Sequence, residues 1–280
     1  MRRGAHTASM PSTDAAPKPL LLARWCLIVA MMVFVMVVVG GITRLTESGL
    51  SMVRWEPISG IIPPLNAQQW AVEFRAYQAT PEYLKVNAGM SLAAFKSIFF
   101  WEYLHRVIGR LIGLAMIVPL IWFALKRAFP KGYGRRFAAL AALVVLQGAI
   151  GWWMVASGLT GSMVSVASYR LAIHLGIGFA ILGLIAWFVL QLQRSEGELL
   201  QARRQRSQRM ARWGLALVAT GFLQVLLGAL VAGIDAGRNF PEWPLMAGQF
   251  VPPGLFELEP AWRNFLENPG LVQFTHRMVA

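Results

Sequence analysis

The sequence is poor in charged residues, in acids and in cysteine, and each shortage excludes a class of protein. Only 14% of the 280 residues are charged and 56% are hydrophobic, which is more apolar surface than a soluble domain of this length can bury. The single cysteine, Cys26, excludes an internal disulfide and any metal site that is built from several thiolates. A soluble or disulfide-stapled protein is therefore excluded.

The shortage of acids leaves a net charge of +13, with 26 lysines and arginines against 13 acidic residues. Nucleic-acid binding would explain such a charge if the basic residues lined one face. They gather instead in a few short connections, as the positive-inside rule requires of a membrane protein. We therefore expect a lipid bilayer and not a nucleic acid as the partner of these charges.

Long apolar runs account for most of the chain. Crossing about 30 Å of hydrocarbon takes about 20 helical residues, and a backbone in lipid must satisfy its own hydrogen bonds. The predicted spans are Leu20–Ile42, Val107–Leu125, Phe137–Ala156, Leu171–Leu190 and Trp213–Ile234, with a sixth that begins near Val272. The predicted fold class is an all-α polytopic membrane protein.

The connections predict the orientation. Basic residues crowd between the second and third spans and between the fourth and fifth, whereas the connection between the third and fourth has none before Arg170. The amino terminus is therefore expected on the cytoplasmic side, and the long connections Thr43–Lys96 and Asp235–Gly270 on the opposite side. Residues 1–19, which are polar, are expected to form a disordered cytoplasmic tail.

An internal repeat relates the two parts of the chain. Glycine, tryptophan and proline positions of the first part recur about 188 positions later, and Leu104-His105-Arg106 is matched by Thr275-His276-Arg277. The matched positions are Gly40, Gly49, Trp55, Gly60 and Pro63-Pro64 with Gly228, Gly237, Trp243, Gly248 and Pro252-Pro253. We expect two parallel four-helix repeats, residues 20–195 and 196–280, the second lacking its last spans.

Three histidines, His105, His174 and His276, lie at or in the predicted spans. Ionisable residues at membrane depth are costly, so a functional role is the first hypothesis. At about 1.5 Å per residue, His105 and His174 lie at similar depth in one four-helix unit, roughly 30 and 24 Å from the inner ends of their helices. Two such histidines suit haem iron; zinc, copper and ordinary interfacial hydrogen bonding are the alternatives.

Glu102 and Arg106 flank His105 on the same helix. At haem, Arg106 could pair with a propionate group and Glu102 could take or give a proton; the alternative is an interfacial Glu–Arg pair. The second part has Gln273 where the first has Glu102, which predicts one reactive site and one that only binds. Gln147 and Gln224, inside the third and fifth spans, are expected to form interhelical hydrogen bonds.

Four segments carry a resemblance to a known family. They are GGITRLTESGLSMVRWEPISGIIPP, WEYLHRVIGRLIG, LAIHLGIG and QFTHRMVA, in this order from about residue 25 to the last residue. Together they resemble haem A synthase, the membrane enzyme of cytochrome oxidase assembly. The first long connection has no cysteine pair, and in this the chain resembles the cysteine-free subgroup of the family, which is common in proteobacteria and similar to the mitochondrial form.

The resemblance implies an oxidoreductase of the bacterial inner membrane that oxidises the C8 methyl group of haem O to the formyl group of haem A. It implies that His105 and His174 ligate or adjoin the substrate haem, that Glu102 and His105 are catalytic, and that His276 ligates the iron of a haem b cofactor. The family has a fourth histidine on an eighth span. This sequence does not include that span, so we expect weakened haem b binding and impaired conversion of haem O. The family also suggests a homo-oligomer, and an electron partner is left unidentified.

Two other functions stay open from the residues alone. A membrane cytochrome of the b type, or a haem-binding assembly factor, would use the histidines without chemistry on the ring; the retained Glu102 argues for the enzyme. A transporter would suit the parallel repeat, but only Pro119 interrupts a span and no acidic relay crosses the bilayer.

Overall fold

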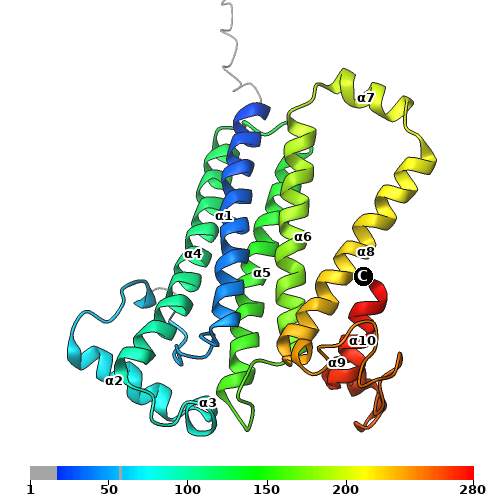
Figure 1. The fold of residues 1–280 in the computed structure, drawn as a ribbon. Coiled ribbons are helices and arrows are strands. Elements are labelled where there is room, and N and C mark those ends of the chain that lie inside the picture. The colour runs from blue at the N-terminus through cyan, green and yellow to red at the C-terminus, as the bar shows by residue number, and fades with distance from the viewer. Residues whose placement is uncertain (1–17, 57–58) are drawn as a thin grey trace, which may run out of the picture.

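The computed structural model describes residues 18–56 and 59–280, and helices dominate this part of the chain (Figure 1). Within these described residues, five helices are long and apolar enough to cross a membrane. They are α1 (Pro19–Leu45), α4 (Leu92–Leu125), α5 (Tyr133–Leu159), α6 (Ser168–Leu192) and α8 (Gln208–Gly233). All five predicted spans and the all-α class are thus confirmed, while most of the predicted tail, residues 1–17, lies outside the described residues.

Helix α4 begins 15 residues earlier than predicted, at Leu92 instead of Val107. The Ser91 side chain caps it by accepting a hydrogen bond from the Ala94 amide, and Pro119 does not end it. Hydropathy placed the boundary at Val107 because charged residues precede that position. The structure puts Glu102, His105 and Arg106 inside one continuous helix, so their spacing is rigid.

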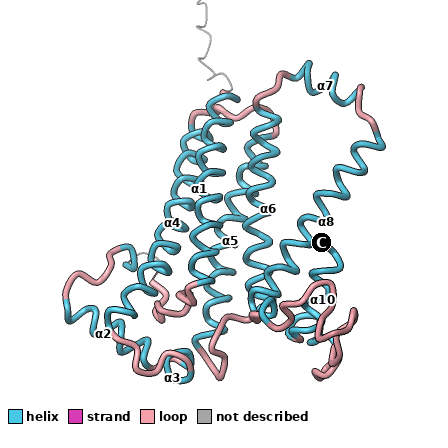
Figure 2. The backbone as a smooth tube through the Cα atoms, viewed as in Figure 1, coloured by secondary structure: helices cyan, strands magenta, loops and turns pink. Residues whose placement is uncertain are grey.

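Helices α1, α4, α5 and α6 form a bundle in which α1 and α5 each pack against both α4 and α6. Helices α4 and α6, which carry His105 and His174, are therefore diagonal to each other. Stacked aromatic rings, with Trp25 between Phe123 and Phe137, fill the core near the start of α1. The other end of the bundle carries the long connections and is called the loop end here (Figure 2).

The connection after α1 folds onto the loop end of α4. It contains η1 (Ser59–Ile61), α2 (Ala67–Gln78) and α3 (Pro81–Lys85), and its aromatic side chains surround Phe95 and Phe99 of α4. Tyr77, fully buried, stacks on Phe95 with ring centroids 5.2 Å apart. This aromatic cluster holds the connection against the helix that carries His105.

The remaining helices pack at the side of α6. Helix α7 (Glu196–Arg204) lies at the end opposite the loop end, and α8 contacts α6 near the loop end and leans away from it elsewhere (Figure 1). Three short helices, η2 (Ala236–Arg238), η3 (Ala261–Arg263) and α9 (Asn264–Glu267), lead to α10 (Pro269–Val279). Arg44 links the end of α1 to the end of α8, because it donates to the Ala232 carbonyl and pairs with Asp235 at 2.9 Å.

Candidate functional site

Glu102 is buried, 3% exposed, and its two oxygens accept hydrogen bonds from different elements, the α1–α2 connection and α4 itself. Oε2 accepts from the Ser51 hydroxyl at 2.7 Å and from the Met52 amide at 2.8 Å. Oε1 accepts from Nε and Nη2 of Arg106 at 3.1 and 2.6 Å. Glu102 thus fixes the start of the α1–α2 connection over the turn of α4 that carries His105, one helical turn away.

Arg106 is the second half of this contact. Its Nη1 donates to the Arg54 carbonyl at 3.0 Å and its Nη2 to the Met52 carbonyl at 2.8 Å. The guanidinium also lies over the Trp55 ring, 5.7 Å from its centroid. The Glu–Arg pair, which the sequence offered as the alternative interpretation, is formed, and the same arginine binds the connection. Pairing of Arg106 with a propionate group stays a prediction.

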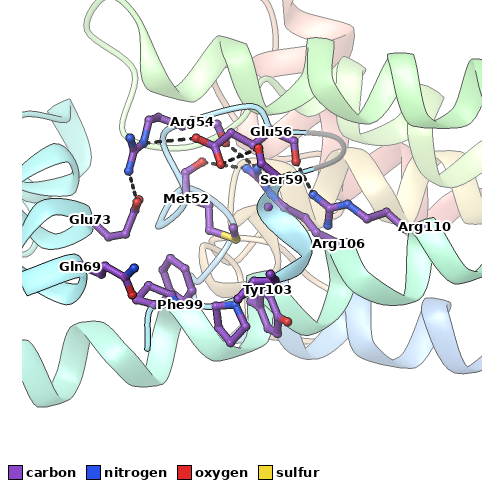
Figure 3. A pocket seen from close by; sticks show the side chains of 14 residues that line it. Met52, Arg54, Glu56, Ser59, Gln69, Glu73, Phe99, Tyr103, Arg106 and Arg110 are labelled. Atoms are coloured by element: carbon purple, nitrogen blue, oxygen red, sulfur yellow. Dashed lines mark hydrogen bonds and ion pairs between the residues drawn. The ribbon is translucent and has the colours of Figure 1, made fainter. Parts of the chain in front are cut away.

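A cavity of about 370 Å³ opens between the α1–α2 connection and α4 (Figure 3). Arg54 pairs with Glu73 across it, and Arg110 donates to the Glu56 carbonyl at 2.7 Å. Arg106 and Tyr103 lie on its α4 side. His105, His174 and His276 are not among the residues that line the cavity, so the cavity is a polar site separate from the histidines.

The His105 ring lies against α1 at a glycine. A Cβ atom added to Gly40 would come 3.3 Å from Nε2 of His105. The absence of a side chain at Gly40 thus makes room for the imidazole between α1 and α4.

On α5, a glycine and a glutamine contact His174, and this pair of contacts is called its seat. A Cβ atom added to Gly151 would come 2.9 Å from Cε1 of the ring, so only glycine fits there without a shift. Four residues earlier, the side-chain amide of Gln147 donates to the His174 carbonyl at 2.9 Å and lies 3.5 Å from its ring Nε2. The expected interhelical bond of Gln147 is confirmed, and its partner is a candidate ligand.

His276 on α10 has the same seat on α8. A Cβ atom added to Gly228 would come 3.3 Å from Cε1 of the ring. The Gln224 amide donates to the His276 carbonyl at 3.1 Å and lies 3.3 Å from ring Nε2. The segments QGAIG and QVLLG both place a glutamine four residues before a glycine. This shared spacing could have indicated that the two glutamines have the same role.

The arginine contacts recur beside His276. Arg277 donates to the Phe240 and Glu242 carbonyls and lies over the Trp243 ring, 5.8 Å from its centroid. Each of these partners stands 188 positions after the corresponding partner of Arg106. Gln273, the counterpart of Glu102, donates to the Phe240 carbonyl at 3.0 Å. The contacts of the two arginines thus match position by position, whereas those of Glu102 and Gln273 differ.

The donor set fits a haem better than a bare metal ion. Among residues 18–56 and 59–280, no group of three His, Cys, Asp or Glu side chains could hold an ion together, and zinc needs three or four such ligands. Ring Nδ1 of both His174 and His276 is buried and has no hydrogen-bond partner. An imidazole nitrogen that is left unpaired in an apolar bundle suits axial ligation of iron.

Known proteins of similar sequence point to one family. The family described as cytochrome oxidase assembly protein matches residues 23–280. A heme A synthase of Dinoroseobacter shibae is 56% identical over 258 residues, which cover 91% of this chain and 67% of the relative. Heme A synthases of Cereibacter sphaeroides and Paracoccus denitrificans are 54% and 52% identical, with the same coverage. No solved structure matches. The chain belongs to the cytochrome oxidase assembly family that includes these heme A synthases.

Proposed function

We propose that the chain is a haem A synthase, an oxidoreductase that converts haem O to haem A. Its similarity to heme A synthases over 91% of its length carries the proposal. The geometry supports it, since His105 and His174 stand on diagonal helices of one bundle, each with its ring against a glycine of a neighbouring helix. A cytochrome would need the histidines but not a buried, hydrogen-bonded Glu102 beside them.

Within this proposal, His105 and His174 hold the substrate haem and His276 holds haem b. The bound haem supplies the iron chemistry of the oxidation. The chain itself excludes water from the ring, because α1 and α5 close against α4 and α6 on both sides. Gly40 and Gly151 leave the space that the two imidazoles occupy.

Glu102 is proposed to accept protons that the reaction releases and to pass them on. Written with water as the formal source of oxygen, conversion of a methyl group to a formyl group releases four protons and four electrons, so the site needs a proton acceptor. Glu102 lies on the same helix face as His105, and its Oε2 is hydrogen-bonded to the Ser51 hydroxyl at 2.7 Å. A proton taken up at Oε2 can pass through this hydroxyl toward the loop end.

The orientation follows from charge. The basic connections between α4 and α5 and between α6 and α8 lie at the end opposite the loop end, so this end and the amino terminus are proposed to face the cytoplasm of a bacterial inner membrane. The loop end, with Glu102 and the cavity, then faces the outer side. The electrons leave through a partner that docks on the assembled protein.

Pigment extraction tests the proposal. The chain is expressed in cells that supply haem O, and the extract is separated into haem O and haem A. We expect haem A, and its loss in His105→Ala and His174→Ala but not in His6→Ala, which changes a histidine of the tail. Unchanged haem O together with a haem b spectrum in the purified protein would refute the synthase and favour a membrane cytochrome.

A further inference from the structure

One arginine connects the two helices against which His105 and His276 lie. Arg44, near the end of α1, donates through Nε to the Ala232 carbonyl of α8 at 3.0 Å and through Nη2 to Asp235 at 2.9 Å. The Ala232 carbonyl is among the last four of α8, which a helix leaves without an i+4 amide partner, and a cation at that end suits the helix dipole. Helix α6 packs against both α1 and α8, and Arg44 connects these two helices directly.

The two ends of this link are matching positions of the repeat that the sequence predicts. Ala232 stands 188 positions after Arg44, and Asp235 stands 188 positions after Glu47. Arg44 could pair within its own region with Glu47, three residues on, but among the described residues its ion pair is with Asp235 of the other region. Because the second region has alanine at the matching position, a single arginine serves both regions.

Each end of the link lies one helical turn from a glycine that faces a histidine. Gly40, four residues before Arg44, faces Nε2 of His105, and Gly228, four residues before the bonded carbonyl, faces Cε1 of His276. An α-helix bonds each amide to the carbonyl four residues earlier. A short path of helix turns and side-chain hydrogen bonds therefore runs from one glycine to the other and fixes the spacing of the two surfaces against which the rings lie.

We propose that Arg44 is a positioning residue that holds the His105 and His276 sites at the separation across which electrons pass between them. The inference rests on the proposed function, in which conversion of the methyl group formally releases four electrons in the first region. These electrons pass one at a time to the ferric iron of haem b in the second region, and from there to a one-electron acceptor protein, which leaves haem b oxidised again. Electron transfer between buried centres slows steeply as they move apart, so loss of the Arg44 link slows the exchange.

Flash photoreduction of the purified holoprotein, with haem A in the first region and haem b in the second, tests this proposal. The two pigments absorb at different wavelengths, so the movement of electrons between them can be followed. In Arg44→Met we expect the exchange to be about tenfold slower, which is about 1.4 kcal/mol in the activation barrier, with both Soret bands kept. Arg44→Lys keeps a charge for Asp235 and should recover part of the rate.

The matched control is Arg263→Met. Arg263 also pairs with an acid, Glu267, and donates to a carbonyl, that of Glu259, but all three residues belong to one connection. This variant should leave the exchange rate unchanged.

A distance measurement tests the same link without haem. Nitroxide labels on Phe100→Cys of α4 and Met278→Cys of α10, in a chain that also carries Cys26→Ala, report the separation of the helices that carry His105 and His276. The two labelled side chains are 52% and 45% exposed, so the labels have room. By pulsed EPR we expect one narrow distance distribution, and a longer or broader one when Arg44→Met is added.

A contact that only stabilises the fold would lower the unfolding temperature of Arg44→Met and leave the exchange rate and the distance unchanged, which would overturn the proposal. Equal changes in Arg263→Met would also overturn it. If Arg44→Met is poorly folded by size-exclusion chromatography, Asp235→Asn decides, because it keeps the carbonyl bond and should slow the exchange to a smaller extent. A protein that forms haem A but holds no haem b would refute this inference and leave the proposed function standing. Absence of any Soret band would refute both.

Discussion

The regions around His105 and His276 have matched backbones and different side chains at the reactive position. In both, an arginine next to the histidine binds two carbonyls of the preceding connection and covers a tryptophan ring. Both connections start with a residue of positive φ, Glu47 at 51° and Asp235 at 53°. Where the first region has Glu102, however, the second has Gln273.

This difference distinguishes a residue that only holds the connection in place, Gln273, from one that is proposed to take part in the reaction, Glu102. Gln273 keeps a hydrogen bond to the connection, at 3.0 Å to the Phe240 carbonyl, so an amide suffices to hold the loop. Glu102 binds its loop through donors, the Ser51 hydroxyl and the Met52 amide, and brings a charge that Arg106 must balance. A buried ion pair is a poor way to gain stability, so the acid is better explained by chemistry.

The largest effect should come from making the first region resemble the second. Glu102→Gln keeps the size of the side chain and removes the proton acceptor, so we expect haem A formation to fall about 10²- to 10⁴-fold while the Soret band remains. Haem A is measured in pigment extracts against bound haem. The matched control is Glu267→Gln, which breaks an i, i+4 pair with Arg263 that is more exposed. Full activity in Glu102→Gln would remove this acid from the mechanism.

Replacing the two arginines should destabilise the two regions by different amounts. Arg106→Leu leaves the Glu102 carboxylate buried without its partner, a loss of about 3–5 kcal/mol. Arg277→Leu removes hydrogen bonds to carbonyls but strands no charge, so about 1–3 kcal/mol is expected. Unfolding of both variants in mixed micelles measures the free energies. Equal losses would show that the Glu102 charge does not distinguish the regions.

A smaller effect concerns Glu82, a buried acid of α3 in the first region. Burial raises its pKa from 4.5 to about 7; the Tyr77 hydroxyl opposes this, and the charges of Glu102 and Glu47 add to it. Because the unfolded chain releases this proton first, stability should fall as the pH rises from about 4.5 to 7 and then level off.

Glu82→Gln tests this linkage. The variant keeps the shape without a titrating group, so it should be more stable than the unsubstituted protein by about 1–3 kcal/mol at pH 8, with the gain vanishing near pH 4.5. Thermal unfolding followed across this pH range gives the difference. A gain that is the same at every pH would mean that Glu82 does not titrate in the fold.

The sequence predicted the five spans, because apolar runs are local patterns. The pair of Glu102 with Arg106, at i, i+4 spacing, was considered only as the alternative to contacts with haem. The sequence did not predict the early start of α4, since hydropathy counts Lys96, Glu102 and Arg106 as breaks although each has a partner in the fold. Nor did it predict that Ser51 and the Met52 amide bind Glu102, because these contacts depend on the path of a loop.

The smallest effects should come from three glycines of α5 and α8, of which only Gly151 and Gly228 face a histidine ring. Gly148 has no atom within 4 Å of an added Cβ, so Gly148→Ala should stabilise α5 by about 0.5–1 kcal/mol through helix propensity. In Gly151→Ala the new methyl would come 2.9 Å from Cε1 of His174, so the ring must move and the gain is lost. In Gly228→Ala the approach to His276 is 3.3 Å, and a smaller ring shift is expected. Thermal unfolding and the ferric g-values of the three variants check this order. A g-value change in Gly148→Ala as large as that in Gly151→Ala would mean that the glycines act on helix packing and not on the imidazoles.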